Sequence, residues 1–305
     1  MKQGTVVTIG TFDGMHLGHQ TILREVRAQA QALALPSHAY AFSSPPRWAH
    51  SLIDEQYLLL PKAVKRELIE TFVDATHPAT FESVRFMEPE EFVISVLVEQ
   101  LNARVVVEGE TFRFGRHRRG DLDTLRSIGR DKGIDVIGVP PVLIGQEVVS
   151  STRIRDLLRS GDIRGASACL GRPPLVQGHV VRGDQLGGQL GFPTANLATE
   201  PHILLPMAGI YLVHASGPGI LANGLLYVGT RPTLGGRAPR CEVHLLDFSY
   251  RTLYGETLML QILEKIRSDR AFPTLGALRD QIDQDVSTAR HLLSEYPLDG
   301  ERISS

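Results

Sequence analysis

The sequence has little of several features that would place it in a specialised class of protein. Its 305 residues include two cysteines, Cys169 and Cys241, in different halves and without CxxC spacing, which excludes a disulfide framework or a cysteine metal site. No apolar run approaches the roughly 20 residues that span a bilayer. The N-terminal strand meets Asp13 without the apolar core of a signal peptide. The formal net charge is only −2, so nothing draws the whole chain to nucleic acid or anionic lipid. We therefore expect a cytoplasmic protein with no nucleic-acid or membrane partner.

Hydrophobic residues make up 42% and charged residues 22% of the chain, which is typical of a globular protein. Up to about residue 170, short β-rich runs alternate with stretches of helical spacing. This alternation predicts an α/β domain with a Rossmann-like parallel sheet covered on both faces. The predicted strands are 5–9, 38–42, 103–107 and 134–139, and the predicted helices are 17–35, 55–72, 89–101 and 122–132.

The pattern of predicted secondary structure changes after about residue 172. Short β-like runs then follow one another closely, separated by Gly and Pro turns, which predicts a small antiparallel β-barrel. A helical pattern over 274–293 closes the chain, with Thr274 as its N-cap. The predicted strands of this half are 175–181, 210–215, 225–228, 241–248 and 257–266. We therefore expect two domains, at 1–172 and 173–305.

The first motif, GTFDGMHLGH, covers residues 10–19 and lies where a strand gives way to a helix. Ligands of an open α/β sheet bind beyond the carboxyl ends of the strands, and a helix N-terminus there favours an anion. His16 and His19 can share one face of the first turn and donate hydrogen bonds to phosphate oxygens. The alternatives are that the two histidines bind a metal ion or are structural. A metal ion would need a third and a fourth ligand, and none follows nearby at a spacing typical of metal sites.

A second motif, VSSTRIRDLL at residues 149–158, lies at the far end of the same half. Ser150, Ser151 and Thr152 can cap a helix and offer hydroxyls to phosphates, and Arg153 brings a forked donor. By itself the stretch could be a plain capped amphipathic helix. Together with HxGH, it resembles the nucleotidyltransferase superfamily that transfers AMP from ATP onto a phosphate. In that superfamily the histidines and the Ser/Thr-Arg segment hold the triphosphate.

A basic loop, EGETFRFGRHRRGD, lies between these motifs at residues 108–121. Phe112 and Phe114 alternate with Arg113, and three more arginines follow. Such a loop could hold a planar ring and a phosphate, or it could be a solvated charged loop. The sequence leaves both possibilities open.

The second half opens with RGDQLGGQLGFPTANL at residues 182–197, which is not a Walker P-loop. Its glycines, Gly183 and Gly191 among them, make the stretch pliable, and Thr194 and Asn196 then offer oxygen ligands. A Mg²⁺ ion held largely by nucleotide phosphates needs only one or two protein oxygens, and Thr194 is the candidate.

Glu242 lies on a predicted strand, on the same face as His244. A carboxylate near a bound alcohol could serve as the general base of phosphoryl transfer, although such a residue by itself is more often an exposed strand position. Six stretches occur in order: GFPTAN, GIYLV, VGTRPT, EVHLLDF, LYG and IRSDRAF. Together they resemble riboflavin kinase. With the first half, nearly the whole chain resembles the bacterial bifunctional riboflavin kinase/FAD synthetase (FMN adenylyltransferase) family.

The resemblance implies two ATP-dependent reactions. Residues 173–305 would phosphorylate riboflavin to FMN with Mg²⁺, and residues 1–172 would adenylylate FMN to FAD and release pyrophosphate. Riboflavin, FMN and ATP would be the small-molecule partners, and FMN and FAD the flavins bound as substrate or product. The oligomeric state stays open.

The resemblance also implies roles for single residues. Glu242 would activate the ribityl hydroxyl, and His16 and His19 would stabilise the reacting α-phosphate. The implied binding residues are Gly10, Phe12, Asp13 and Gly14 in the first loop, Ser151, Thr152 and Arg153 at the ATP phosphates, Gly183, Gly191, Thr194 and Asn196 at Mg-ATP, and Arg267 with Phe272 on the flavin side.

The sequence departs from the family pattern at three places. The family often reads Phe-Asp-Pro-His-Pro where Ser43 and its neighbours give FSSPP, Asp or Asn where Thr111 stands, and Arg where Gly188 stands. These changes remove polar contacts to substrate but leave HxGH, SSTRIR, PTAN and Glu242 intact, so we expect both activities. The alternatives are a kinase with a weak or inactive first domain, a flavin-binding regulatory protein, and an adenylyltransferase for another phosphorylated acceptor.

Overall fold

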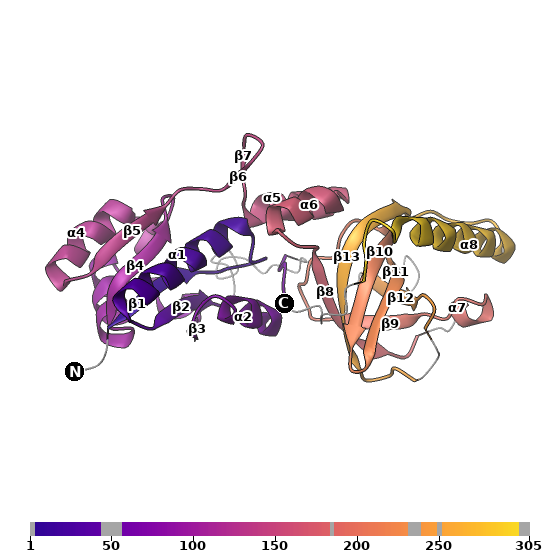
Figure 1. The fold of residues 1–305 in the computed structure, drawn as a ribbon, viewed down its shortest axis with the longest axis horizontal. Coiled ribbons are helices and arrows are strands. Elements are labelled where there is room, and N and C mark those ends of the chain that lie inside the picture. The colour runs from indigo at the N-terminus through magenta and orange to yellow at the C-terminus, as the bar shows by residue number, and fades with distance from the viewer. Residues whose placement is uncertain (1–3, 44–56, 184–185, 231–238, 249–251, 299–305) are drawn as a thin grey trace. The chain divides into compact units, whose positions relative to one another are not determined.

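The computed structural model describes residues 4–43, 57–183, 186–230, 239–248 and 252–298. They fall into two compact units, drawn in Figure 1. The first unit comprises residues 1–58 and 62–151, and the second comprises 59–61 and 152–305. Helices α5 (Ser151–Ser160) and α6 (Ile163–Leu170) therefore belong with the second unit, apart from Ser151. The functional boundary after residue 172 stays a prediction.

The first unit is built on a parallel sheet with the strand order β3-β2-β1-β4-β5. The order reverses between β1 and β4, which is where an open α/β sheet forms its ligand crevice. This sheet confirms the predicted Rossmann-like fold. The strands are β1 (Thr5–Gly10), β2 (Ser37–Phe42), β3 (Ala75–Ala79), β4 (Ala103–Gly109) and β5 (Asp135–Val139), and a small hairpin, β6 (Leu143–Ile144) and β7 (Glu147–Val148), follows.

Helix α1 (Leu17–Leu33) shows how local sequence fixes an element of this unit. His16 is its N-cap, and the buried Leu23, Val26 and Ala30 recur at helical spacing on the face toward the core. The helix ends where Ala34 turns into the left-handed region at φ 51°. The other helices are α2 (Lys62–Glu70), α3 (Pro89–Phe92), which continues as the π-helical η3 (Val93–Gln100), and α4 (Leu122–Lys132), with short 3₁₀ turns η2 (Phe81–Ser83) and η4 (Arg116–Arg118).

Two elements of the first unit differ from the prediction. Strand β3 escapes sequence analysis because it is short, carries Pro78 and is an exposed-to-half-buried edge strand. The predicted helix 55–72 is wrong over residues 57–61, since the helix begins only at Lys62. Pro61 explains the late start, because the residue before a proline is pushed out of the helical region.

The second unit contains a closed antiparallel barrel with the strand order β10-β11-β12-β9-β8-β13, which confirms the predicted barrel. Strand β9 was not predicted, because it is only five residues long and begins just after a glycine-rich stretch and Pro193. The strands are β8 (Leu175–Val181), β9 (Ala195–Thr199), β10 (Gly209–Gly217), β11 (Ile220–Thr230), β12 (Pro239–Leu245) and β13 (Thr257–Ser268), with the short helix α7 (Leu186–Gln189) between β8 and β9.

Helix α8 (Leu275–Leu292) packs against the barrel, as Figure 1 shows. Thr274 is its N-cap as predicted, since its hydroxyl accepts a hydrogen bond from the N–H of Ala277 at 3.1 Å. The buried Ala289 joins Leu212 and Leu263 of the barrel in one apolar cluster. This packing brings the N-terminal half of α8 to one wall of a hollow described below.

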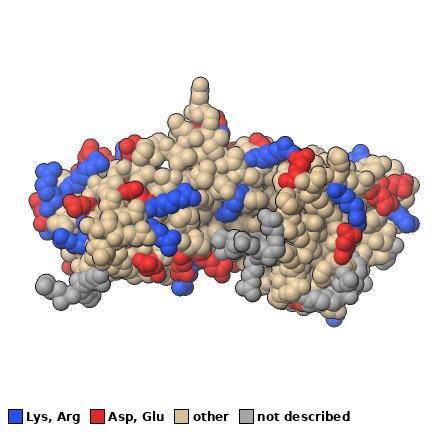
Figure 2. Space-filling model, viewed as in Figure 1, with Lys and Arg blue, Asp and Glu red and all other residues tan. Residues whose placement is uncertain are grey.

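Basic and acidic side chains are interspersed on the face of the molecule seen in Figure 2. This distribution agrees with the near-zero net charge of the sequence. Within the described ranges, no helix is long and apolar enough to cross a membrane.

Candidate active sites

The first candidate site is a cleft of about 300 Å³ at the carboxyl ends of β1 and β4. Its walls come from these two strand ends, the first turn of α1, and the segments before and after the β6–β7 hairpin. The predicted residues Gly10, Phe12, His16 and His19 all border it, and so does Thr111. The cleft lies at the reversal of strand order, the position at which this class of sheet binds ligands.

His16 and His19 meet in the way their spacing predicts. Their rings stack with 3.6 Å between centroids and 18° between planes. His16 Nδ1 also accepts a long 3.4 Å hydrogen bond from the N–H of His19. Burial lowers the pKa of His19 well below its usual value, and electrostatic interaction with His16 and with the Lys65 ammonium acts in the same direction. His19 is therefore a neutral imidazole near pH 7, able to donate one N–H.

The loop between β1 and α1 is held in an uncommon backbone conformation. Phe12 has φ 49° and Gly14 has φ 83°, a left-handed geometry that glycine adopts readily and phenylalanine rarely. Two contacts fix this loop: the hydroxyl of Ser151 donates to the carbonyl of Asp13 at 2.8 Å, and the ammonium of Lys65 donates to the carbonyl of Thr11 at 3.0 Å. Sequence analysis missed Lys65, because a single lysine on a helix carries no motif.

The remaining predicted residues of the SSTRIR motif stay predictions. Thr152 and Arg153 follow Ser151 in the first turn of α5 and belong to the second unit. The N–H of Ser43 donates to the carbonyl of Ala79 at 2.9 Å, extending the β2–β3 pairing. The following residues 44–46 of the FSSPP stretch lie outside the described residues.

The basic loop after β4 divides between core and surface. Phe114 is buried and stacks on Phe112 at 5.5 Å between ring centroids. Arg116 and Arg119 both lie 3.7 Å from the carboxylate of Glu88, so these arginines form surface ion pairs. Phe112, by contrast, borders the cleft. The loop is thus a charged surface segment that offers one aromatic ring to the site.

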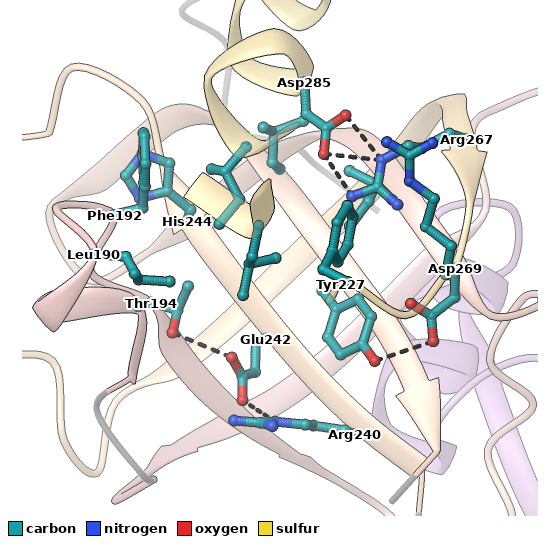
Figure 3. A pocket seen from close by; sticks show the side chains of 17 residues that line it. Leu190, Phe192, Thr194, Tyr227, Arg240, Glu242, His244, Arg267, Asp269 and Asp285 are labelled. Atoms are coloured by element: carbon teal, nitrogen blue, oxygen red, sulfur yellow. Dashed lines mark hydrogen bonds and ion pairs between the residues drawn. The ribbon is translucent and has the colours of Figure 1, made fainter. Parts of the chain in front are cut away.

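The second candidate site centres on Glu242 of the barrel (Figure 3). Its Oε2 accepts a hydrogen bond from the hydroxyl of Thr194 at 3.2 Å, and its Oε1 accepts one from Nε of Arg240. Glu242 is 9% exposed. Sequence analysis missed Arg240, although its position two residues before Glu242 on one strand places both on the same face.

The glycine-rich stretch brings its polar residues to this carboxylate. Asn196 lies directly opposite Glu242 in the pairing of β9 with β12. Gly183 lies close against Asn196: a Cβ at residue 183 would come 2.1 Å from the amide nitrogen of Asn196, so the Asn196 side chain would have to move. Gly191 has φ 93°, which favours glycine there. The structure thus gathers Thr194, Asn196 and Glu242 at one place.

Glu242 borders a hollow of about 290 Å³ between the barrel and α8 (Figure 3). Its far wall holds a buried ion pair, in which Nε and Nη2 of Arg267 donate to the Asp285 carboxylate at 2.9 and 2.8 Å. The guanidinium also lies 5.6 Å from the ring centre of Phe272. Apolar side chains line the rest of the hollow, including Leu190, Phe192, Ile210, Leu225, Leu278 and Ile282.

A second hollow of about 520 Å³ adjoins the first at Thr194, which borders both. Gly188 and Tyr254 are among the residues around this second hollow. Nothing lies within 4 Å of the position that a Cβ on Gly188 would occupy. There is thus open space where the family often carries an arginine side chain. Thr194 thus borders both spaces, and its hydrogen-bond partner Glu242 borders the first.

Sequence families match the two units in the same order. The FAD synthetase family matches residues 1–153, and the riboflavin kinase family matches residues 170–293. The fold and both clefts therefore belong to a two-part transferase. The chain is a member of the bifunctional riboflavin kinase/FMN adenylyltransferase family, which confirms the resemblance found in the sequence.

Individual relatives cover nearly all of the chain. A bifunctional riboflavin kinase/FMN adenylyltransferase from Haemophilus influenzae is 35% identical over 94% of each chain. The protein of the same name from Escherichia coli K12 is 34% identical over 95% of this chain and 93% of its own. A crystal structure named as a macrolide-efflux protein from Streptococcus pneumoniae superposes with a TM-score of 0.87 at 30% identity, covering 95% of both chains.

Proposed function

We propose that this enzyme makes FMN from riboflavin in the barrel unit and FAD from FMN in the first unit, consuming ATP in both steps. Family membership supports the two activities and their order along the chain. We assign the adenylyltransferase to residues 1–172 and the kinase to residues 173–305. The observation that carries the kinase assignment is the hydrogen bond from Thr194, which borders both hollows, to Glu242, which borders the first.

In the kinase reaction, riboflavin would occupy the hollow between the barrel and α8. Its apolar walls suit a planar ring system, and the polar end at Glu242 suits the ribityl chain. ATP would occupy the adjoining hollow. Glu242 takes the proton of the terminal ribityl hydroxyl. The oxygen of that hydroxyl attacks the γ-phosphorus, and ADP leaves. Thr194 lies where the attacking hydroxyl and the transferred phosphoryl group meet.

The residues beside Glu242 fit a magnesium ion. The donors present there are the hydroxyl of Thr194, the side-chain amide of Asn196 and the Glu242 carboxylate, which are oxygen ligands of the kind Mg²⁺ prefers. Thr194 and Asn196 would hold the ion together with the nucleotide phosphates. When bound, Mg²⁺ supplies charge neutralisation at the β- and γ-phosphate oxygens.

In the adenylyltransferase reaction, a phosphate oxygen of FMN attacks the α-phosphorus of ATP, and pyrophosphate leaves. No covalent enzyme intermediate is needed, so positioned donors that stabilise the developing charge can carry the catalysis. His16 and His19 stack at the N-terminus of α1 and would donate hydrogen bonds to the α-phosphate. Ser151, Thr152 and Arg153 would hold the triphosphate.

A time course tests both steps in one experiment. The purified chain is incubated with riboflavin, ATP and Mg²⁺, and the three flavins are separated by chromatography. We expect FMN to rise first and FAD to follow. FMN without FAD would contradict the second step and favour a kinase with an inactive first unit, whereas no turnover at all would contradict both.

A further inference from the structure

A buried glutamate occupies the point at which β1 and β4 separate. The two strands pair in parallel up to Val7 opposite Val106. Further on, the N–H of Ile9 donates to Oε1 of Glu108 at 2.5 Å, and the hydroxyl of Thr8 lies 3.3 Å from the same oxygen. The side chain of Glu108 thus replaces a backbone acceptor between two strands at the reversal of strand order, where the ligand crevice opens.

The second carboxyl oxygen of Glu108, Oε2, is left for the cleft. Glu108 is 3% exposed and borders the cleft of about 300 Å³ that His16 and His19 also border. Both of its hydrogen bonds end on Oε1. Within the part of the chain that the structure describes, Oε2 has no hydrogen-bond or ion-pair partner. Since both hydrogen bonds occupy Oε1 and the side chain lines the cleft, Oε2 is the carboxyl oxygen that points to a ligand contact.

The protonation state of Glu108 follows from its surroundings. Burial raises the pKa of its carboxyl well above the usual value, and the hydrogen bonds from Ile9 and Thr8 oppose this shift only in part. The other titratable groups around the cleft are His16 and His19 on α1 and the exposed Glu110 after β4, and none pairs with Glu108. Because Oε1 already accepts two hydrogen bonds, the proton that burial favours would be carried by Oε2, which would then be a donor toward the cleft.

We propose that Oε2–H of Glu108 donates a hydrogen bond to an uncharged acceptor atom in the ribose or base of the ATP bound in the first unit. This inference rests on the proposed adenylyltransferase function. The apolar wall made by Val139, Pro140, Pro141 and Val142 suits a nucleobase, and the paired histidines suit the phosphates. Glu108 borders the same cleft as both, so the sugar and base of the nucleotide lie within its reach. A neutral donor also avoids the repulsion that a carboxylate would exert on the triphosphate.

Two variants separate a donor role from a purely structural one. In E108Q, the amide oxygen can accept from Ile9 while the amide N–H₂ donates toward the cleft. In E108L, the leucine side chain has a similar volume but can neither accept the hydrogen bond from Ile9 nor donate one toward the cleft. The measurement is kcat and the KM for ATP in FAD formation from supplied FMN, between pH 6 and pH 10. Riboflavin kinase activity of the same molecules reports intact folding of the second unit, and E99Q, an exposed position on η3, is the matched control.

We expect the KM for ATP of E108Q to stay within about threefold of the wild type, and that of E108L to rise about tenfold with little change in kcat, as loss of one hydrogen bond predicts. The wild-type KM should rise at alkaline pH as Glu108 ionises, and this rise should be absent in E108Q. A purely structural role would not produce that pH dependence.

Three results would overturn the inference. If E108Q raises the KM as much as E108L does, an ionised carboxylate is required instead of a donor. If E108L keeps the wild-type KM and only unfolds more easily, Glu108 merely joins β1 to β4. If the wild-type chain forms no FAD, the proposed function of the first unit fails and this inference fails with it; the first two results arise only in an active enzyme, so the failures are distinguishable.

Discussion

Replacement of Asp285 by asparagine should weaken the second unit far more than the first. Asp285 is 3% exposed and accepts three hydrogen bonds of 2.8 to 3.1 Å from Arg267. Gln281 donates to the same carboxylate at 2.8 Å. Asparagine keeps the size and one acceptor oxygen but removes the negative charge. The guanidinium of Arg267 is then held in the wall of the hollow without a counter-charge.

The magnitude follows from the burial of the pair. Removal of one partner of a buried ion pair costs about 3–5 kcal/mol. The side chain of Arg267 retains 18% exposure and asparagine keeps one acceptor, so the cost lies at or below the lower end, about 2–3 kcal/mol. For a unit of this size, each kcal/mol lowers the midpoint of thermal unfolding by about 2–4 °C. We therefore expect D285N to lose FMN formation roughly 5–10 °C earlier than the wild type.

The two activities of the chain make the assay selective. Samples are heated to a series of temperatures and cooled, and FMN formation from riboflavin and FAD formation from supplied FMN are measured separately. FMN formation should fail at the lower temperature, whereas FAD formation should keep its wild-type temperature dependence. D283N, an exposed aspartate on the same helix, is the control for a change of charge alone.

The reasoning would be refuted if D285N and D283N lost FMN formation at the same temperature. In that case the desolvation of both charges would cancel their attraction, and the ion pair would not stabilise the wall of the hollow. A loss of both activities at the same lowered temperature would instead refute the assignment of the two reactions to separate units.

Three further predictions concern the proposed catalytic and positioning residues. E242Q should lower the rate of FMN formation at least about 100-fold, because the base is lost, and leave FAD formation from supplied FMN unchanged; equal rates in E242Q and the exposed control E200Q would contradict the role of Glu242. H19A should do the reverse, lowering FAD formation about 100-fold, and a loss of FMN formation in a folded protein would contradict the two-site assignment. Burial lowers the pKa of Lys65 to about 8 in the folded chain, so the unfolded chain binds more protons between pH 8 and pH 10.5. The free energy of unfolding of the first unit should therefore rise across that range by up to about 3 kcal/mol. Urea denaturation followed by FAD-forming activity should show this rise in the wild type and not in K65M; an identical pH dependence in both would contradict it.

Local signals in the sequence predicted many elements correctly. Helix α4 has its predicted bounds because Asp121 caps its N-terminus and Gly133, at φ 68°, ends it. The HxGH motif also predicted that His16 and His19 share one face of the first turn of α1, because residues three apart in a helix are neighbours. Their rings stack there. In these cases the determining atoms lie within one turn of the chain, so no tertiary contact is needed to infer them.

The sites themselves depend on contacts between distant residues. Thr194 and Glu242 are 48 positions apart, and Ile9 and Glu108 are 99 apart. The sequence determined which residue types this chain carries at each motif and, through its periodicity, that an α/β sheet precedes a β-barrel. Only the tertiary structure decided that Arg267 is held by Asp285 and that Glu108 lies in the crevice between β1 and β4. The reason is physical: strand register and helix docking are set by burial of the whole core, and a polar side chain shows its partner only when that packing is complete.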